Sequence, residues 1–150
     1  MPAQFFELYA FKLLNLRCMK KPEKVFIIDD DNDDVELFIE AVNSVDPSIQ
    51  CYNAFNSDDA LKKLMYTMEI LPDIIFLDLN MPGINGKQCL TEIKKSEKLK
   101  DIPVVIYTTS SFHKDIEETK KLGASHFLTK PSSFSDTCKI LSEIIFKEVN

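Results

Sequence analysis

Glycine is scarce in this chain, and the few glycines lie far apart. Only three occur among the 150 residues, Gly83, Gly86 and Gly123. Dinucleotide-binding G-x-G-x-x-G turns and P-loops both need clustered glycines, because their backbone must come close to phosphate groups. The sequence therefore excludes both of these nucleotide-binding motifs.

Cysteine pairs and long apolar runs are missing as well. The four cysteines, at positions 18, 51, 89 and 138, form no C-x-x-C and no other short spacing. This pattern argues against a zinc site and against a disulfide framework, and it suits unpaired thiols in a reducing cytoplasm. Since no apolar run approaches the roughly 18 residues of a membrane span, we expect a cytoplasmic protein without a transmembrane segment.

Basic residues are in the minority, and they are concentrated near the N-terminus. The chain has 18 Lys and Arg against 24 Asp and Glu, which gives a formal charge of −6 and a pI near 4.9. Five basic and two acidic residues give residues 1–24 a charge of +3, which leaves −9 for the remainder. Nucleic-acid binding needs a basic face, so we expect no nucleic-acid partner.

Residues 1–23 are expected to form an N-terminal extension to a domain of residues 24–150. The apolar stretch at 5–16 is interrupted by an acidic and a basic residue and has no small-residue cleavage site after it, so it does not resemble a targeting signal. Met19 is followed by a sequence that would open a domain naturally. The extension is therefore either an amphipathic segment or upstream sequence from a misassigned start.

Short apolar runs alternate with segments of helical periodicity from Val25 onward. The apolar runs predict five strands, at residues 25–28, 49–55, 74–77, 104–107 and 126–128. The periodic segments predict five helices: one that ends at Asp46-Pro47, one capped by Ser57 that runs to about Met68, one after the Pro82-Gly83 turn, one closed by Gly123, and one at 134–149. Strands that alternate with helices indicate an α/β fold with a doubly wound parallel sheet.

Polar side chains follow the ends of the predicted strands. Acidic residues come after the first and third strands, hydroxyl groups after the fourth and a lysine after the fifth: Asp29, Asp30, Asp31, Asp78, Thr108, Thr109 and Lys130. The carboxyl ends of parallel strands meet at one edge of a sheet, where such folds bind ligands, so we expect these groups to converge. Clustered carboxylates must protonate or recruit a cation, and Mg²⁺ or Mn²⁺ prefers such oxygen ligands.

This set of groups suits phosphoryl chemistry. A divalent cation, a lysine and hydroxyl groups together stabilise a negatively charged phosphoryl group. One aspartate can then act as the nucleophile and form an acyl phosphate. Asp78 is the candidate, because it ends a central strand directly before a tight Met81-Pro82-Gly83 loop.

Four motifs, in this order along the chain, resemble the CheY-like receiver domain of two-component response regulators. They are FIIDDD at 26–31, FLDLNMPG at 76–83 followed by Gly86, VVIYTT at 104–109, and GASHFLTKP at 123–131. The similarity covers about residues 24–148. It implies a flavodoxin-like sheet of five parallel strands in the order 2-1-3-4-5, with helices on both faces.

The resemblance implies a role for each residue of the acidic cluster. Asp78 would accept a phosphoryl group from a sensor histidine kinase or from a histidine phosphotransfer protein. Asp30 and Asp78 would bind Mg²⁺ or Mn²⁺ through their carboxylates, Asn80 through its backbone carbonyl, and Asp29 partly through water. Asp31 falls outside this set, and we expect it to be an acid at a helix N-terminus, where the helix dipole favours it.

The resemblance also implies phosphoryl contacts and a switch. Thr108 and Thr109 would contact the phosphoryl group, Lys130 would pair with it, and the peptide bond from Lys130 to Pro131 would be cis. Thr108 would move toward the phosphoryl group, and Phe127, at a position where tyrosine is also common, would fill the space behind the fourth strand. The face formed by the fifth strand and the last two predicted helices would then bind an unknown downstream protein.

We therefore expect a phosphorelay signalling protein that catalyses only its own phosphorylation and dephosphorylation, and not an enzyme with a separate substrate. Two alternatives are a receiver-like binding module that works without phosphorylation and an aspartyl-phosphate phosphatase. The first would have lost Asp78 or Lys130, and both are present. The second would place its nucleophile after the first strand, with an acid two residues later. Here Asp78 follows the third strand, and the residue two positions later is Asn80.

Overall fold

The sheet contains five strands in the part of the chain that the computed structural model describes, residues 22–148. They are β1 (Lys24–Ile28), β2 (Gln50–Ala54), β3 (Ile74–Leu77), β4 (Val104–Thr108) and β5 (His126–Thr129). All neighbouring strands are parallel, and their order is β2-β1-β3-β4-β5. The predicted doubly wound, flavodoxin-like sheet with the strand order 2-1-3-4-5 is confirmed.

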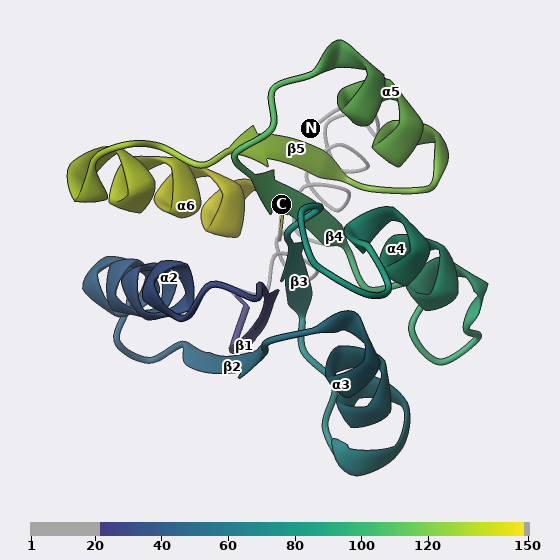
Figure 1. Ribbon diagram of the computed structural model, residues 1–150. Helices are drawn as coiled ribbons and strands as arrows, with labels where there is room; N and C mark the ends of the chain where they lie inside the picture. The colour runs from purple at the N-terminus through teal and green to yellow at the C-terminus, as the bar shows by residue number, and fades with distance from the viewer. Residues whose placement is uncertain (1–21, 149–150) are drawn as a thin grey trace, which may run out of the picture.

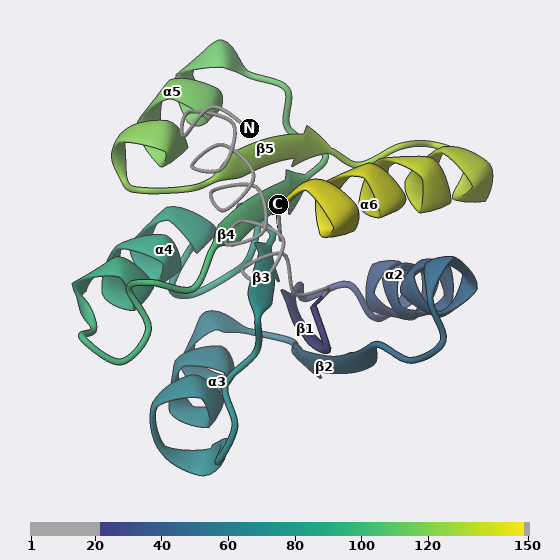
Figure 2. The same ribbon diagram turned by 180° about the vertical axis from the view of Figure 1, so that it is seen from behind.

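Helices cover both faces of the sheet (Figures 1 and 2). On one face, α2 (Asn32–Val45) and α6 (Phe134–Glu148) pack side by side. The other face carries α3 (Ser57–Lys62) with its π-helical continuation η1 (Lys63–Thr67), α4 (Gly86–Lys95) and α5 (His113–Lys121). The strand order reverses at β1, so the switch point where such folds bind ligands lies beyond the ends of β1 and β3.

Side chains of the central strands alternate between two apolar cores. In β1, Val25 and Ile27 pack with α2 and α6, whereas Phe26 and Ile28 pack with α3 and α4. None of these four side chains is more than 1% exposed. Because both faces of the sheet are covered, the central strands need apolar residues at every position, which explains their continuous apolar runs.

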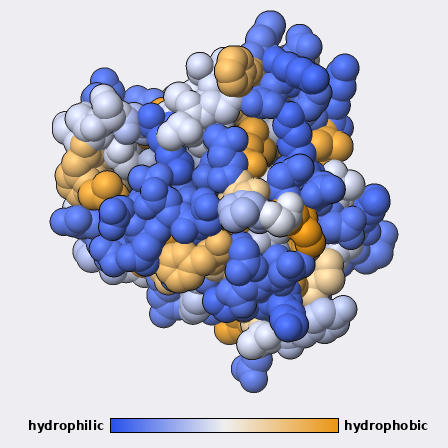
Figure 3. Space-filling view, in the orientation of Figure 1, coloured by the Kyte–Doolittle hydropathy of each residue, from blue (hydrophilic) through white to orange (hydrophobic). Residues whose placement is uncertain are grey.

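The surface carries the polar residues that the cores exclude. Figure 3 shows a mostly hydrophilic face on which apolar residues lie in separate small patches. The exposed large apolar side chains of the described residues come from different elements and loops: Leu37, Phe55, Tyr66, Ile70, Phe112, Phe134 and Phe146. Scattered apolar residues of this kind are normal for a globular protein.

The second predicted helix differs from the observed one at both ends. Asn56, and not Ser57, is the N-cap, since the Asn56 side chain accepts the Asp59 N–H at 2.8 Å. Ser57 is buried, and its hydroxyl donates to the carbonyl of Ile84 at 2.7 Å. The prediction of Ser57 as cap is therefore wrong, because a contact 27 residues away takes its hydroxyl. At the other end, the α-helix changes to the π-helical turn η1.

Other sequence predictions on the helices agree with the structure. Asp31 caps α2 and accepts the N–H groups of Asp33 and Asp34. Gly123 follows α5 with φ of +104°, in the left-handed region that favours glycine. Within residues 22–148, every helix is too short or too polar to cross a membrane. Most of the predicted extension, residues 1–21 with Met19, lies outside the described residues.

Candidate functional site

The site lies at the carboxyl edge of the sheet, where each of three charged residues is the first one beyond its strand. Asp29 follows β1, Asp78 follows β3 and Lys130 follows β5. Their backbone N–H groups still donate to the last residue of a neighbouring strand, to Ala54, Ile28 and Thr108 at 3.1, 3.0 and 2.7 Å respectively. The hydrogen-bond ladder of the sheet therefore fixes the positions from which these side chains start.

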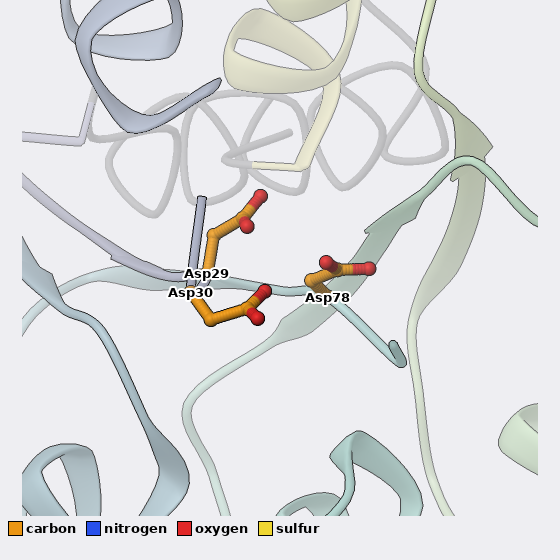
Figure 4. Close-up of side chains that lie close together, drawn as sticks. All are labelled: Asp29, Asp30 and Asp78. Atoms are coloured by element: carbon orange, nitrogen blue, oxygen red, sulfur yellow. The ribbon is translucent and has the colours of Figure 1, made fainter. Parts of the chain in front are cut away.

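Figure 4 shows three carboxylates gathered at the ends of β1 and β3. Asp29, Asp30 and Asp78 each offer an oxygen, and these oxygens lie within 4.8 Å of one another. Asp29 and Asp78 are 0% and 5% exposed, whereas Asp30 lies open to solvent. Carboxylates at this spacing repel one another unless a cation or a proton compensates them. The predicted convergence of these three acids is found in the structure.

Lys130 supplies a positive charge within this cluster. Its Nζ donates to Asp29 Oδ2 at 2.6 Å and to Asp34 Oδ2 at 2.8 Å, and it lies 3.6 Å from Asp78 Oδ2. Only 9% of the lysine side chain is exposed. The face of the Tyr107 ring is 5.8 Å from the ammonium group, a distance that allows a cation–π contact. Lys130 is thus held among acids in a largely dry environment.

Asp34 is a site residue that was not predicted from the sequence. The signal was present, because Asp34, Phe38 and Ala41 are spaced at i, i+4 and i+7, and the latter two are buried on the inner face of α2. An acid on the inner face of a helix needs a partner of opposite charge. The partner is Lys130, which is 96 residues away in the sequence and becomes a neighbour only through the fold.

The charges of this cluster depend on burial and on pairing. Burial raises the pKa of Asp29 to about 6, and hydrogen bonds from Lys130 and from the Asp31 N–H offset only part of this rise. For Lys130, burial acts to lower the pKa, but hydrogen bonds to Asp29 and Asp34 outweigh it and keep the pKa above its ordinary value. Lys130 therefore stays cationic, while Asp29 takes up a proton at a higher pH than an ordinary aspartate does.

Hydroxyl groups reach the same edge from β4. Thr108 is fully buried, and its Oγ1 accepts long hydrogen bonds from Asn80 Nδ2 and the Ser110 N–H, both at 3.4 Å. Thr109 is exposed, and its Oγ1 lies 3.5 Å from the same Asn80 nitrogen. The Asn80 N–H donates to Asp78 Oδ1 at 3.2 Å. Asn80 thus links the Asp78 loop to both threonines, while metal ligation by its backbone carbonyl stays a prediction.

Phe127 lies behind this edge, on the side of α5. It is half-buried, and it packs against the core beneath α3 and α4. It also lines a pocket of about 350 Å³ between α5 and β5, together with Ile116, Thr119, Lys120, Ala124, Ser125 and His126. A pocket beside a half-buried ring leaves room for that ring to change position.

The peptide bond between Lys130 and Pro131 is trans, as are all peptide bonds of the described residues. The predicted cis bond is therefore wrong. The trans form is favoured by about 0.5–1 kcal/mol even before proline. With the trans bond, Lys130 already makes its backbone bond to Thr108 and its side-chain bonds to Asp29 and Asp34.

Gly86 holds the loop that carries Asp78 against the start of α4. A Cβ at position 86 would lie 2.3 Å from the carbonyl oxygen of Asp78 and 2.6 Å from the Cα of Leu79. Real Cβ atoms do not come this close to backbone, so only glycine fits here without a shift. Asn85 caps α4 with a capping box, which fixes the helix start at this point.

Replacement of Gly86 by alanine is expected to lower the free energy of unfolding by about 1–3 kcal/mol, the usual cost of forcing an extra methyl group into a packed region. Urea unfolding measures this loss. Gly83→Asn is the matched control in the same loop, because Gly83 has a φ of +78° but no atom within 4 Å of its Cβ position. Asparagine tolerates that backbone region. A Gly86→Ala protein as stable as the control would contradict the close contact.

Comparisons with curated proteins find relatives among regulatory proteins. Response regulator Rcp1 of Synechocystis is 40% identical over 73 residues, which is 49% of this chain and 50% of that protein. The probable methanogenesis regulatory protein FilR2 of Methanothrix harundinacea is 39% identical over 74 residues, 49% of this chain and 48% of that protein. The matched part thus spans about half the length of these relatives.

Solved structures agree with the observed fold over most of the described residues. The crystal structure of the phosphorylated cyanobacterial phytochrome response regulator RcpA has a TM-score of 0.75 at 31% identity, covering 81% of this chain and 90% of that one. The Mn²⁺-bound form of Rcp1 has a TM-score of 0.73 at 29% identity, covering 82% and 91%. The family model for the response regulator receiver domain matches residues 25–142. The chain therefore belongs to the response regulator receiver domain family of two-component systems.

Proposed function

We propose that this receiver domain accepts a phosphoryl group on Asp78 from the phosphohistidine of a sensor histidine kinase or a histidine phosphotransfer protein. A carboxylate oxygen of Asp78 attacks phosphorus, the phosphorus–nitrogen bond breaks, and the imidazole leaves as an acyl phosphate forms. The observation that carries this proposal is the position of Asp78: it is buried at the switch point, with carboxylates of Asp29 and Asp30 on one side and the Lys130 ammonium 3.6 Å away.

The acidic cluster fits a hard divalent cation. Its donors are all carboxylate oxygens, which Mg²⁺ and Mn²⁺ prefer, and the exposure of Asp30 leaves space for the water that these ions retain. Among the described residues, Lys130 is the ion-pair partner of Asp29, Asp34 and Asp78, and Asp30 adds a fourth carboxylate, so the cluster has negative charge to spare. Receiver domains bind divalent metal, and the Rcp1 structure holds Mn²⁺. We assign Asp29, Asp30, Asp78 and the Asn80 carbonyl as ligands, and the ion would neutralise charge on the phosphoryl group.

Lys130 and the two threonines then complete the phosphoryl site. The Lys130 ammonium lies 3.6 Å from Asp78 Oδ2, and it pairs with a phosphoryl oxygen. The Thr108 hydroxyl donates to another, with the exposed Thr109 hydroxyl beside it. These donors lie at the same edge of the sheet as Asp78, and Lys130 and Thr108 move toward the phosphoryl oxygens when the transfer takes place.

Incubation with acetyl phosphate and Mg²⁺ tests this function directly. One acyl phosphate adds about 80 Da to the intact mass, as expected for a carboxylate nucleophile. Chelation of the metal with EDTA should abolish the gain, because uncompensated acids repel the anionic donor. A wild-type protein whose mass stays unchanged in Mg²⁺ would contradict the proposal and favour a binding module that works without phosphorylation.

The residue two positions after Asp78 argues against the remaining alternative, an aspartyl-phosphate phosphatase. Such a phosphatase needs an acid two residues after its nucleophile, and the amide of Asn80 at that position is too weak an acid to serve as a general acid. We therefore infer that the protein catalyses only its own phosphorylation and dephosphorylation. The thiols of Cys51, Cys89 and Cys138 are free, which fits a reducing compartment and our assignment to the cytoplasm.

We further propose that phosphorylation switches the face formed by α5, β5 and α6. A phosphoryl group on Asp78 attracts the Thr108 hydroxyl, since a charge-assisted hydrogen bond is worth about 1.5–3 kcal/mol. Movement of Thr108 away from its bonds with Asn80 and Ser110 frees space behind β4, and the Phe127 ring is placed to fill it. The pocket that Phe127 lines then changes shape, and a downstream protein binds the altered face.

Thr108→Ala is expected to accept phosphate but to lose this switch, because alanine has no hydroxyl for the phosphoryl group to attract. NMR shifts of Phe127 and of Lys120 and Lys121, with and without a beryllofluoride phosphoryl mimic, measure the change on this face. We expect large shift changes in the wild type and small ones in the variant. Equal changes in both proteins would contradict the switch and leave phosphorylation on Asp78 untouched.

A further inference from the structure

Lys130 has an acidic partner outside the three-carboxylate cluster. Asp34 stands in the first turn of α2, where Asp31 caps the helix and accepts the Asp34 N–H. Asp34 Oδ2 accepts a hydrogen bond from Lys130 Nζ at 2.8 Å. This bond joins the start of α2 to the loop between β5 and α6. Asp34 therefore acts on Lys130 directly.

The two hydrogen bonds of Lys130 hold its ammonium short of Asp78. Asp29 and Asp34 lie at 2.6 and 2.8 Å, within hydrogen-bond distance, whereas Asp78 lies at 3.6 Å, beyond it. A lysine ammonium has three N–H donors, and Lys130 uses two of them to bond Asp29, just after β1, and Asp34, in α2. To donate at normal length to a group carried by Asp78, the ammonium must weaken its hold on one of these two partners.

Burial decides which partner is released more easily. The Asp29 side chain is 1% exposed, so a freed carboxylate there would lose its partner without gaining water. The Asp34 side chain is 35% exposed, and water can replace the lysine when the bond breaks. Asp34 is consequently the partner that Lys130 gives up at the lower cost.

We propose that Asp34 is a positioning residue that holds Lys130 in the unphosphorylated protein and competes with the phosphoryl group on Asp78 for its ammonium. This inference rests on the proposed phosphorylation of Asp78. Asp34 touches neither the phosphoryl group nor the metal. Because the bond between Asp34 and Lys130 must break first, it lowers the net free energy that Lys130 gains by binding the phosphoryl group.

Removal of the Asp34 charge should therefore strengthen binding of a phosphoryl mimic. Partly exposed ion pairs contribute at most about 1 kcal/mol, so the expected gain in affinity is about two- to fivefold. The probe is beryllium fluoride in the presence of MgCl₂, titrated into wild type and Asp34→Asn and followed by NMR. The titration measures equilibrium binding and needs no phosphoryl donor.

Asp33→Asn is the matched control. Asp33 is exposed, lies in the same first turn of α2 and also donates its N–H to Asp31, but the partner of Lys130 in this turn is Asp34. Both variants remove one negative charge beside the site and one favourable charge at the helix N-terminus. A general effect of charge or helix stability would therefore appear in both, and a difference between them isolates the bond to Lys130.

A second measurement detects the hydrogen bond between Lys130 and Asp34 directly, in the absence of metal and phosphoryl mimic. The ¹⁵N signal of the Lys130 ammonium in the free protein should shift in Asp34→Asn and stay in place in Asp33→Asn. The proposal predicts this shift together with the gain in mimic affinity. Equal mimic affinity in wild type and both variants, or weaker binding by Asp34→Asn, would overturn the competition. A wild type that does not bind the mimic would overturn the proposed function itself.

Discussion

Replacement of Asp78 by asparagine is expected to abolish phosphorylation completely. Asparagine has nearly the same shape and size, and it can keep the backbone bond to Ile28 and accept the Asn80 N–H, so the fold should survive. It has no anionic oxygen to attack phosphorus. Intact mass after incubation with acetyl phosphate and Mg²⁺ should show the gain of about 80 Da in wild type and none in the variant.

Asp58→Asn is the matched control for this experiment. Asp58 is an exposed carboxylate in the first turn of α3, away from the carboxylate cluster. It should be phosphorylated like the wild type, which would exclude a general effect of losing one negative charge. Labelling of Asp78→Asn at the wild-type level would show that another residue accepts the phosphoryl group and would contradict the assignment.

Replacement of Lys130 by methionine is expected to cost about 3–5 kcal/mol of folding free energy in the metal-free protein near pH 7.5. Methionine keeps most of the apolar stem but leaves Asp29 and Asp78, both buried, without their cation. Urea unfolding in EDTA measures the loss. Added Mg²⁺ should restore part of it, because a bound cation replaces the missing positive charge.

The stability of the Lys130→Met variant should also depend on pH in a way that follows from the pKa of Asp29. The pKa of Asp29 is raised by burial to about 6 in the folded protein, so between pH 4 and 6 the folded state binds more protons than the unfolded one. The stability contribution of Asp29 therefore falls as pH rises through this window. Without the lowering effect of Lys130, the pKa rises further, and the penalty extends to higher pH. The loss in free energy of unfolding of Lys130→Met relative to the wild type should therefore be larger at pH 7.5 than at pH 5.

Lys87→Met is the matched control that separates the effect of losing a buried lysine from the effect of losing a positive charge. Lys87 also has two acidic partners, Asp115 at 2.7 Å and Glu118, but its side chain is 30% exposed against 9% for Lys130. Exposed ion pairs contribute little, since water screens them and replaces the lost contact. We expect a much smaller loss of stability, with little response to Mg²⁺. Equal losses for the two lysines would contradict the role assigned to the buried cluster.

Sequence patterns predicted the sheet and the acidic cluster because both follow from local order along the chain. Strands buried on two faces need continuous apolar runs, and the residue after each run must fall at the carboxyl edge. Asp29, Asp78 and Lys130 are placed by this rule alone, whatever the rest of the chain does. Their assigned roles came from the resemblance to receiver domains and stay predictions.

Features that depend on distant contacts were not predictable in the same way. Asn56 and Ser57 are both good caps, and the choice between them is made by the Ile84 carbonyl, which the Ser57 hydroxyl meets only in the folded protein. The bond from Asp34 to Lys130 likewise depends on how α2 lies against the loop after β5. The local sequence indicates that such polar groups need hydrogen-bond partners, but which residues become their partners depends on the tertiary structure.

The backbone amides of Asp29, Asp78 and Lys130 should be protected from hydrogen exchange, because they are hydrogen-bonded within the sheet. Each of these amides closes onto the last carbonyl of an adjacent strand, so its proton can exchange with deuterium only when that strand end opens. Exposed residues of the same site, such as Asp30 and Asn80, have no such restriction on their side chains. The charges that must keep their spacing are thus tied by backbone bonds to the ends of the strands, while the groups that must admit water, metal and phosphate lie at the exposed surface of the site.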